Sequence, residues 1–315
     1  MWGIVPAAGS GTRIQPLAFS KELLPVGSRL DGETERPRAV SEFLLERMVL
    51  GGADTVCIDL GPGKSHILEY FGGQYGPASL AYVVQPQPGG RPHGLCDAIF
   101  RALPLIPAGD PVIVGLPDTV WFPDDALRHL PDDGLSFLLF PVENPALFDA
   151  VITDRTGRVV EIRVKRADAG TPWIWGAFKM PGRVLAELHA LWRARDRRDE
   201  YMGTLINAWI AQGGQAMGVR AGEAYVDVGT VHGYRAAMGL LAAPPRQGSS
   251  AAASALRAVA TGGEWGALIW SSASGIWTPG STIWIWAASA PPRTISCSIT
   301  LGRSGAASPM PSRPT

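Results

Sequence analysis

The feature that most constrains the fold is an alternation of short apolar segments with amphipathic segments, which continues to about residue 243. Strands that alternate with helices in this way are typical of a mainly parallel sheet with helices on both faces. The sequence therefore predicts an α/β, Rossmann-like domain over residues 1–243. We expect strands at Gly3–Pro6, Thr55–Leu60, Leu80–Gln85, Pro111–Gly115, Leu135–Val142, Trp173–Lys179, Ala216–Arg220 and Ala224–Asp227.

The segments between these strands have the apolar spacing of helices, apart from a hairpin turn at "TDRTGRVV", where Gly157 occupies the position that favours positive φ. We expect helices around Ala39–Leu50, Ser65–Phe71, Gly94–Leu103, Asp124–Leu130, Arg183–Ala194 and Met202–Ala211, and a last helix after Thr230.

Residues 244–315 form a second region of different composition. This region has no Lys or Asp, a single acid at Glu264, and five of the chain's 11 tryptophans. An uncharged run follows Glu264, but Gly, Ser, Thr and Pro279 interrupt it, which disfavours a membrane span. We expect a poorly ordered tail without an assigned function; a short strand at "STIWIWA" and out-of-frame coding are alternatives.

The charge balance argues against binding to nucleic acid or to a membrane surface, and the cysteine content favours a cytoplasmic protein. Lys plus Arg and Asp plus Glu each number 28, which gives no basic footprint for nucleic acid and no basic run for a membrane surface. Cys57, Cys96 and Cys297 are few and lack metal-ligand spacing, as is usual in a reducing cytoplasm. The N-terminus shows no signal-peptide pattern, so the sequence predicts a cytoplasmic protein.

A glycine-rich stretch, "AAGSGTR", follows the first strand, and "SKELLP" comes shortly after it. Glycines let consecutive amides face an anion, and Arg13 and Lys21 add two positive charges. A dinucleotide fingerprint fails because Ile14 stands where a third glycine is required, and "LGPGKS" fails as a Walker loop because its first glycine would fall at Ile58. We interpret Ser65 in that second segment as a helix N-cap. The first stretch is either a phosphate-binding loop or a tight turn with solvated basic side chains.

The longer stretch "GSGTRIQPLAFSKELLPVG" closely resembles the signature of sugar-1-phosphate nucleotidyltransferases, of which glucose-1-phosphate thymidylyltransferases and uridylyltransferases are the most similar members. Further similar segments follow in the family's order: "VQPQPGGRPHGLCDAI", "VGLPDTVWFPDD", "VEIRVKRAD", "IWGAFKM" and "AYVDVGTVHGY". The resemblance covers about Met1 to Leu241. It implies the nucleotide-diphospho-sugar transferase fold, which is glycosyltransferase-A-like, and the reaction of an NTP with a sugar 1-phosphate to give an NDP-sugar and pyrophosphate.

The resemblance also implies roles for individual residues on the nucleotide side. Asp118 and Asp227 each follow a predicted strand, where α/β sheets place ligands, and Mg²⁺ is held by one or two carboxylates plus phosphate oxygens. For both aspartates, an Asx-turn or a helix cap is the structural alternative. The implied residues are Arg13 and Lys21 as catalytic cations, Ala8, Gly9, Ser10, Gly11 and Thr12 as the nucleotide loop, Gln85 and Gly94 at the pyrimidine base, and Asp118 and Asp227 as Mg²⁺ ligands.

On the sugar side the resemblance implies that Lys165 and Gly176 bind the sugar phosphate. The structural alternative for Lys165 is a solvated lysine at a strand end, and for Gln85 it is a residue that caps the next loop. One of Trp173 and Trp175 could form a wall of the sugar site, but we favour core packing for both. Three positions depart from the family pattern, which has an acid, a glycine and a proline where this chain has Val164, Ala150 and Arg166.

These departures leave alternatives to the expected substrates, dTTP or UTP with glucose 1-phosphate. One alternative is a cytidylyl or guanylyl transferase for another phosphorylated acceptor, and another is a catalytically silent regulatory subunit that binds nucleotide sugars. The resemblance also implies a possible homo-oligomer.

Overall fold

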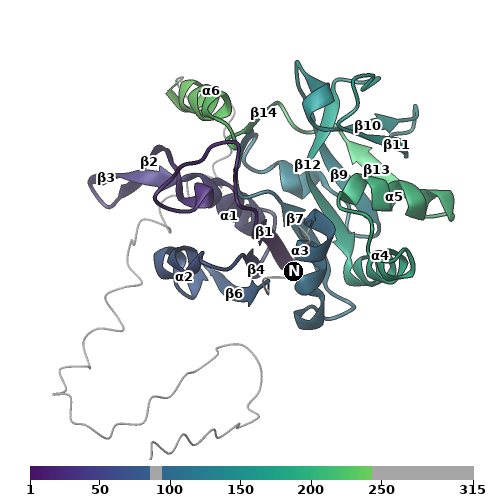
Figure 1. Ribbon diagram of the computed structural model, residues 1–315, viewed down its shortest axis with the longest axis horizontal. Helices are drawn as coiled ribbons and strands as arrows, with labels where there is room; N and C mark the ends of the chain where they lie inside the picture. Colours follow the sequence, from purple (N-terminus) through teal and green to yellow (C-terminus); the bar gives the residue numbers. More distant parts are fainter. Residues whose placement is uncertain (86–93, 243–315) are drawn as a thin grey trace, which may run out of the picture. The chain divides into compact units, whose positions relative to one another are not determined.

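The structure is a computed structural model that describes residues 1–85 and 94–242 (Figure 1). The predicted tail over residues 244–315 lies outside the described residues, as do all residues between Gln85 and Gly94. In the described part, no helix combines the length and the apolar character that crossing a membrane requires.

The described residues contain a ten-stranded mixed sheet with parallel strands at its centre. Strand β1 pairs in parallel with β4 and β7, and β4 pairs in parallel with β6. Strand β12 then runs antiparallel to β7 and β9, and β10 and β11 continue the sheet on that side. The strands are β1 (Trp2–Ala7), β4 (Thr55–Leu60), β5 (Gln74–Tyr75), β6 (Ala78–Val84), β7 (Pro111–Gly115), β9 (Leu135–Pro141), β10 (Asp149–Thr153), β11 (Val159–Val164), β12 (Trp173–Pro181) and β13 (Ala216–Val219).

Helices cover both faces of this sheet (Figure 1), which confirms the predicted α/β class. Helices α1 (Val40–Leu50) and α2 (Ser65–Phe71) contribute to one hydrophobic cluster. The opposite cluster includes side chains of α3 (Leu95–Arg101), α4 (Gly182–Ala194) and α5 (Met202–Ala211). The central strands are buried from both sides, which explains why their sequences are almost continuously apolar.

Two local predictions are wrong. The segment predicted as a helix over Asp124–Leu130 forms only a 3₁₀ turn at Ala126–His129, because it is too short and too constrained by Pro123 and Pro131 to continue. Ser65 is the first helical residue of α2 rather than its N-cap; Lys64 is the N-cap, and it makes no side-chain capping bond.

A hairpin of β2 (Pro25–Asp31) and β3 (Thr34–Ala39) was not predicted. Both strands are largely exposed, so neither has the alternation of apolar and polar residues that identifies a half-buried strand. Val26, at the start of this hairpin, packs in a third cluster with side chains of β8 (Thr119–Phe122) and of α6 (Val231–Ala242).

A two-stranded ribbon outside the main sheet positions the predicted metal ligands. It joins β8 (Thr119–Phe122) to β14 (Ala224–Asp227), and its register places Thr119 opposite Asp227. Arg47 of α1 fixes the ribbon from behind by donating to the backbone oxygen of Trp121 and to the carboxylate of Asp124 at 2.6 Å. Since Asp118 directly precedes β8, the ribbon brings the ends of two distant segments together.

Candidate functional site

The glycine-rich loop begins where β1 ends, at the carboxyl edge of the parallel strands. Gly9, Ser10 and Thr12 are exposed, as a loop that receives a ligand requires. Gly11 has φ +65°, and a Cβ at this position would lie 2.8 Å from the Cδ of Lys21. The glycine is therefore needed twice: for its left-handed backbone conformation and for the close passage of the Lys21 side chain.

A buried ion pair supports this loop from the protein side. The Nζ of Lys64 donates to the backbone oxygens of Ala7 and Gly9, both at 2.6 Å, and to Glu22 Oε1 at 2.8 Å. All three donors of the ammonium group are thus used. Lys64 therefore fixes the end of β1 and the start of the loop from the protein side.

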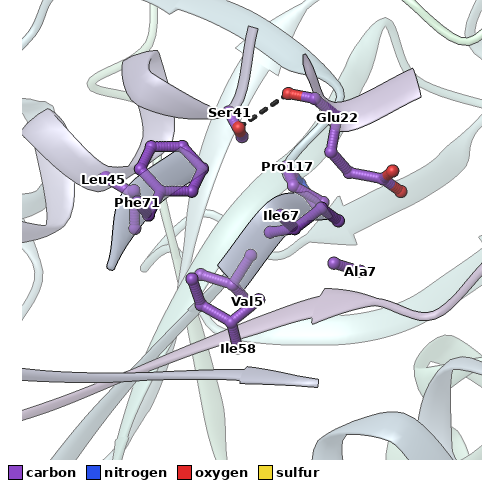
Figure 2. Close-up of a pocket in the computed structure, with 9 residues that line it drawn as sticks. All are labelled: Val5, Ala7, Glu22, Ser41, Leu45, Ile58, Ile67, Phe71 and Pro117. Carbon is purple, nitrogen blue, oxygen red and sulfur yellow. Dashed lines mark hydrogen bonds between the residues drawn. The ribbon is translucent and has the colours of Figure 1, made fainter. Parts of the chain in front are cut away.

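Glu22 lies against an apolar wall (Figure 2). Its backbone oxygen accepts a hydrogen bond from the Oγ of Ser41, and side chains such as Val5 and Ile67 surround a cavity of only about 10 Å³, too small for a substrate. Burial raises the pKa of Glu22 and, in the same environment, lowers the pKa of Lys64. Sequence reasoning missed both residues. A signal existed, since Lys64 follows β4 and the carboxyl ends of neighbouring parallel strands share one edge of the sheet.

Lys21 and Asp118 form a second, mostly buried ion pair. Their Nζ and Oδ2 atoms lie 2.5 Å apart, and the two residues are 97 positions apart in the sequence. Burial by itself lowers the pKa of Lys21, but the charge and hydrogen bond of Asp118, helped by Glu22 and Asp227, raise it above its ordinary value. The ammonium group therefore stays charged at neutral pH.

Arg13 and Asp227 form the more accessible pair of the site. The Nη2 of Arg13 lies 3.2 Å from Asp227 Oδ2, and the side chains are 64% and 22% exposed. Asp227 Oδ1 accepts a hydrogen bond from the amide of Gly229 at 2.7 Å, and the amide of Val228 donates to the backbone oxygen of Asp118 at 2.8 Å. The turn after β14 thus ties the two aspartates to one frame.

Gly229 marks the place where these groups converge. A Cβ at this glycine would lie 2.7 Å from Asp227 Oδ1, 3.0 Å from Arg13 Nη2 and 3.3 Å from Asp118 Oδ2. Three side chains from three separate segments therefore surround one small space. The sequence predicted the charged residues but not Gly229, because the need for this glycine comes from the tertiary packing.

The donor set at this place fits Mg²⁺. Asp118 and Asp227 each supply carboxylate oxygens, and no group of three or more His, Cys, Asp or Glu side chains with metal-binding geometry occurs in the part of the chain that the structure describes. Mg²⁺ commonly takes one or two carboxylates and completes its shell with water and substrate phosphates. A zinc site would instead need additional nitrogen or sulfur ligands.

The predicted base-binding residues lie at the ends of neighbouring elements. Gln85 follows β6, is 7% exposed, and donates from Nε2 to Asp59 Oδ2 at 2.8 Å. Gly94 is the N-cap of α3, and a Cβ there would lie 2.5 Å from the backbone oxygen of Glu200. The close packing of Glu200 is therefore enough to require a glycine at position 94, whether or not Gly94 also contacts a nucleotide.

The predicted sugar-side residues belong to another part of the sheet. Lys165 is exposed, has φ +48°, and places its Nζ 4.4 Å from the ring centroid of Tyr201. Within residues 1–85 and 94–242, no hydrogen bond or ion pair joins it to the Arg13–Asp227 and Lys21–Asp118 pairs. Gly176 lies at an irregularity of β12, where a Cβ would be 2.6 Å from the ring of Phe140.

The two tryptophans of β12 pack as core residues. Trp175 belongs to a buried cluster, and its Nε1 donates to Asp149 Oδ2 at 3.3 Å. Trp173 is partly buried against the same cluster. Both contacts favour the packing interpretation over a wall of a sugar site. Cys57 and Cys96 are buried free thiols that pack among the apolar side chains.

Comparison with known proteins extends this picture. The family model described as "Nucleotidyl transferase" matches residues 2–243. Two curated glucose-1-phosphate thymidylyltransferases, from Mycolicibacterium smegmatis and Neisseria meningitidis, are 26% and 25% identical to the chain over 242 residues. In each case the match covers 73% of this chain and 78% of the relative.

Two solved structures share the fold. One is described as a glucose-1-phosphate thymidylyltransferase of Bacillus anthracis in complex with sucrose, with a TM-score of 0.63, 20% identity, and coverage of 78% of this chain and 97% of that chain. The other is a UTP-bound UGPase of Acinetobacter baumannii, with a TM-score of 0.59, 17% identity, and coverage of 75% and 91%.

Proposed function

Since the chain belongs to the nucleotidyl transferase family and is therefore a nucleotidyltransferase, we propose that it joins an NTP, dTTP or UTP, to a sugar 1-phosphate. Glucose 1-phosphate is the favoured acceptor, and an NDP-sugar and pyrophosphate are the products. The names of the curated relatives and of the UTP-bound structural neighbour support this choice of substrates.

The observation that carries the proposal is the convergence of Arg13, Lys21, Asp118 and Asp227 beside the glycine-rich loop. An oxygen of the sugar phosphate must attack the α-phosphorus in line with the departing pyrophosphate. Enzymes accelerate such a transfer by positioning the groups and neutralising their charge rather than by covalent catalysis. A site that holds fixed cations next to a carboxylate pair is suited to that task.

Each part of this site then has a defined task. The amides of the loop from Ala8 to Thr12 face the NTP phosphates, and Arg13, as the most exposed cation, neutralises the leaving pyrophosphate. Lys21 contacts the α-phosphate or the attacking sugar phosphate, for which its retained charge is essential. Asp118 and Asp227 would hold Mg²⁺, which when bound supplies further neutralisation of the phosphate charge.

Toward the other ends of the substrates, Gln85 and Gly94 meet the pyrimidine base. Lys165 binds the sugar phosphate as an exposed point charge, and the backbone at Gly176 lines the same side. The replacement of an expected acid by Val164 leaves fewer polar contacts for sugar hydroxyls, so the range of accepted sugars needs a direct test.

The test is a release assay. The protein is incubated with Mg²⁺, each of the common NTPs and a panel of sugar 1-phosphates, and pyrophosphate is measured. We expect release with dTTP or UTP and glucose 1-phosphate. Release with CTP or GTP alone would favour the cytidylyl or guanylyl alternative. If folded protein binds nucleotide sugars but releases no pyrophosphate with any pair, the chain is a silent binding subunit and the proposal fails.

A further inference from the structure

Asp59 is a buried acid to which the proposed mechanism assigns no role. It lies on β4 between Pro6 of β1 and Val83 of β6, and its side chain is completely shielded from solvent. Its Oδ2 accepts a hydrogen bond from Gln85, whereas its Oδ1 has no partner among the residues that the structure describes. A buried carboxyl group with an unpartnered oxygen lowers the stability of the fold.

That hydrogen bond fixes the orientation of the Gln85 side-chain amide. An ionised carboxylate only accepts hydrogen bonds, so it binds the NH₂ end of the amide and repels the oxygen end. Because the amide is planar, Oε1 must then point away from Asp59. The side chain therefore presents Oε1 as an acceptor, beside the second N–H of Nε2, on the side turned away from Asp59.

We propose that Asp59 is a positioning residue that makes Gln85 select uracil or thymine over cytosine. The inference rests on the proposed function, in which Gln85 meets the pyrimidine base. Uracil and thymine carry a hydrogen on N3 that Oε1 accepts. Cytosine has an unprotonated N3, so two acceptors would face one another, and a site built around one hydrogen bond strongly rejects the partner that cannot make it.

The surroundings of Asp59 make this selection sensitive to pH. Burial raises the pKa of Asp59 to about 7, against the effects of Gln85, Arg101 and Lys64, which favour the ionised form. Asp97 on α3 acts in the same direction as burial, and the thiol of Cys57 on the same strand has its own pKa raised by burial and by Asp59. Once protonated, Asp59 can donate as well as accept, so it no longer fixes which end of the Gln85 amide faces the base. The preference for uracil or thymine therefore declines as the pH falls through about 7.

Equilibrium binding tests this without depending on turnover. Calorimetric titration of the full chain with dTTP, UTP and CTP in the presence of Mg²⁺ gives the ratio of affinities for dTTP and CTP. Asp59→Asn is isosteric but presents either a donor or an acceptor to Gln85, so we expect the ratio to fall about tenfold and to lose its pH dependence. The control is Asp54→Asn at the other end of β4, where the side chain is 73% exposed and pairs with the N-terminus; this variant should keep the wild-type ratio.

The possible outcomes separate the two proposals. A folded Asp59→Asn protein with an unchanged ratio overturns the role of Asp59. A wild-type ratio that stays constant from about pH 5.5 to about 8.5 does the same without any variant. If dTTP binds with the expected discrimination but no pyrophosphate is released with any acceptor, the role of Asp59 stands and the proposed function fails. If the wild type binds none of the three nucleotides, both fail.

Discussion

The proposed nucleotide side and the proposed sugar side of this protein are built in different ways. On the nucleotide side, Lys21 and Asp118 form a mostly buried pair, and Lys64 is bound by three acceptors beneath the loop. On the sugar side, Lys165 is exposed and rests on the ring of Tyr201.

The charged groups on the first side are therefore held more rigidly than those on the second. In the proposed reaction, the NTP phosphates and Mg²⁺ would require the same geometry whatever the acceptor, so charges at this side gain from being fixed in advance. Lys165 is exposed and contacts one ring, so its side chain can adjust its position to different acceptors. Substitutions on the two sides should therefore differ both in the size of their effect and in the parameter that they change.

The largest effect is expected for Asp118→Asn and for Asp227→Asn. Each change removes a carboxylate that would hold Mg²⁺ and leaves Lys21 or Arg13 without its ion pair. We expect the rate of pyrophosphate release to fall about a thousandfold in each variant. The exposed Asp54→Asn serves as the control for loss of one negative charge. Activity within about tenfold of the wild type in either variant would refute its assignment as a metal ligand.

Next in size is Lys64→Met, which breaks the buried pair with Glu22 and leaves the carbonyls of Ala7 and Gly9 without their donor. We expect the free energy of unfolding to fall by about 3 kcal/mol and the KM for the NTP to rise by about tenfold or more. Urea unfolding and steady-state kinetics measure the two quantities.

Combining Lys64→Met with Glu22→Gln distinguishes a structural role from a positioning role. The double variant removes both buried charges, so part of the lost stability should return. If Lys64 positions the loop, the raised KM for the NTP should persist in the double variant. If KM returns to the wild-type value together with stability, Lys64 acts only on the fold.

A smaller effect is expected for Lys165→Ala. Its ammonium group is exposed and screened by solvent, so we expect the KM for the sugar phosphate to rise by about tenfold while the KM for the NTP stays unchanged. Arg155→Ala, at the exposed hairpin tip, is the control for loss of one positive charge. An equal rise in both KM values would contradict the separation into two sides.

The smallest effect on turnover is expected for Asp59→Asn, which should change stability in addition to nucleotide selectivity. The pKa of Asp59 is raised from 3.8 to about 7 in the folded state, so its favourable contribution is complete below pH 3.8 and is lost as the pH rises through 7. Asparagine does not titrate. At pH 8 the variant should therefore exceed the wild type in free energy of unfolding by about 2–4 kcal/mol, and the difference should shrink toward pH 4. Urea unfolding at both pH values measures this, and a difference independent of pH would contradict the assignment.

Much of the fold could be predicted because the signals are local. The strands β1, β4 and β7 are continuous apolar runs, and α4 and α5 have clear helical spacing, so their bounds agree with the sequence prediction to within a few residues. The exposed β2–β3 hairpin gave no such signal, since neither face of it is consistently buried.

The residues of the candidate site likewise fall into those that the sequence predicted and those that only the structure revealed. The charged and glycine-rich segments and their order could be read from the sequence, because a phosphate loop needs small residues next to basic ones. The contact of Arg13 with Asp227, 214 positions away, and the approach of both to Gly229 are visible only in the folded chain. Those encounters depend on the register of the β8–β14 ribbon and on its packing against α1. The roles of Lys64 and Asp59 could be recognised only in the structure for the same reason, because the role of a buried charge depends on the groups that the folded chain places around it.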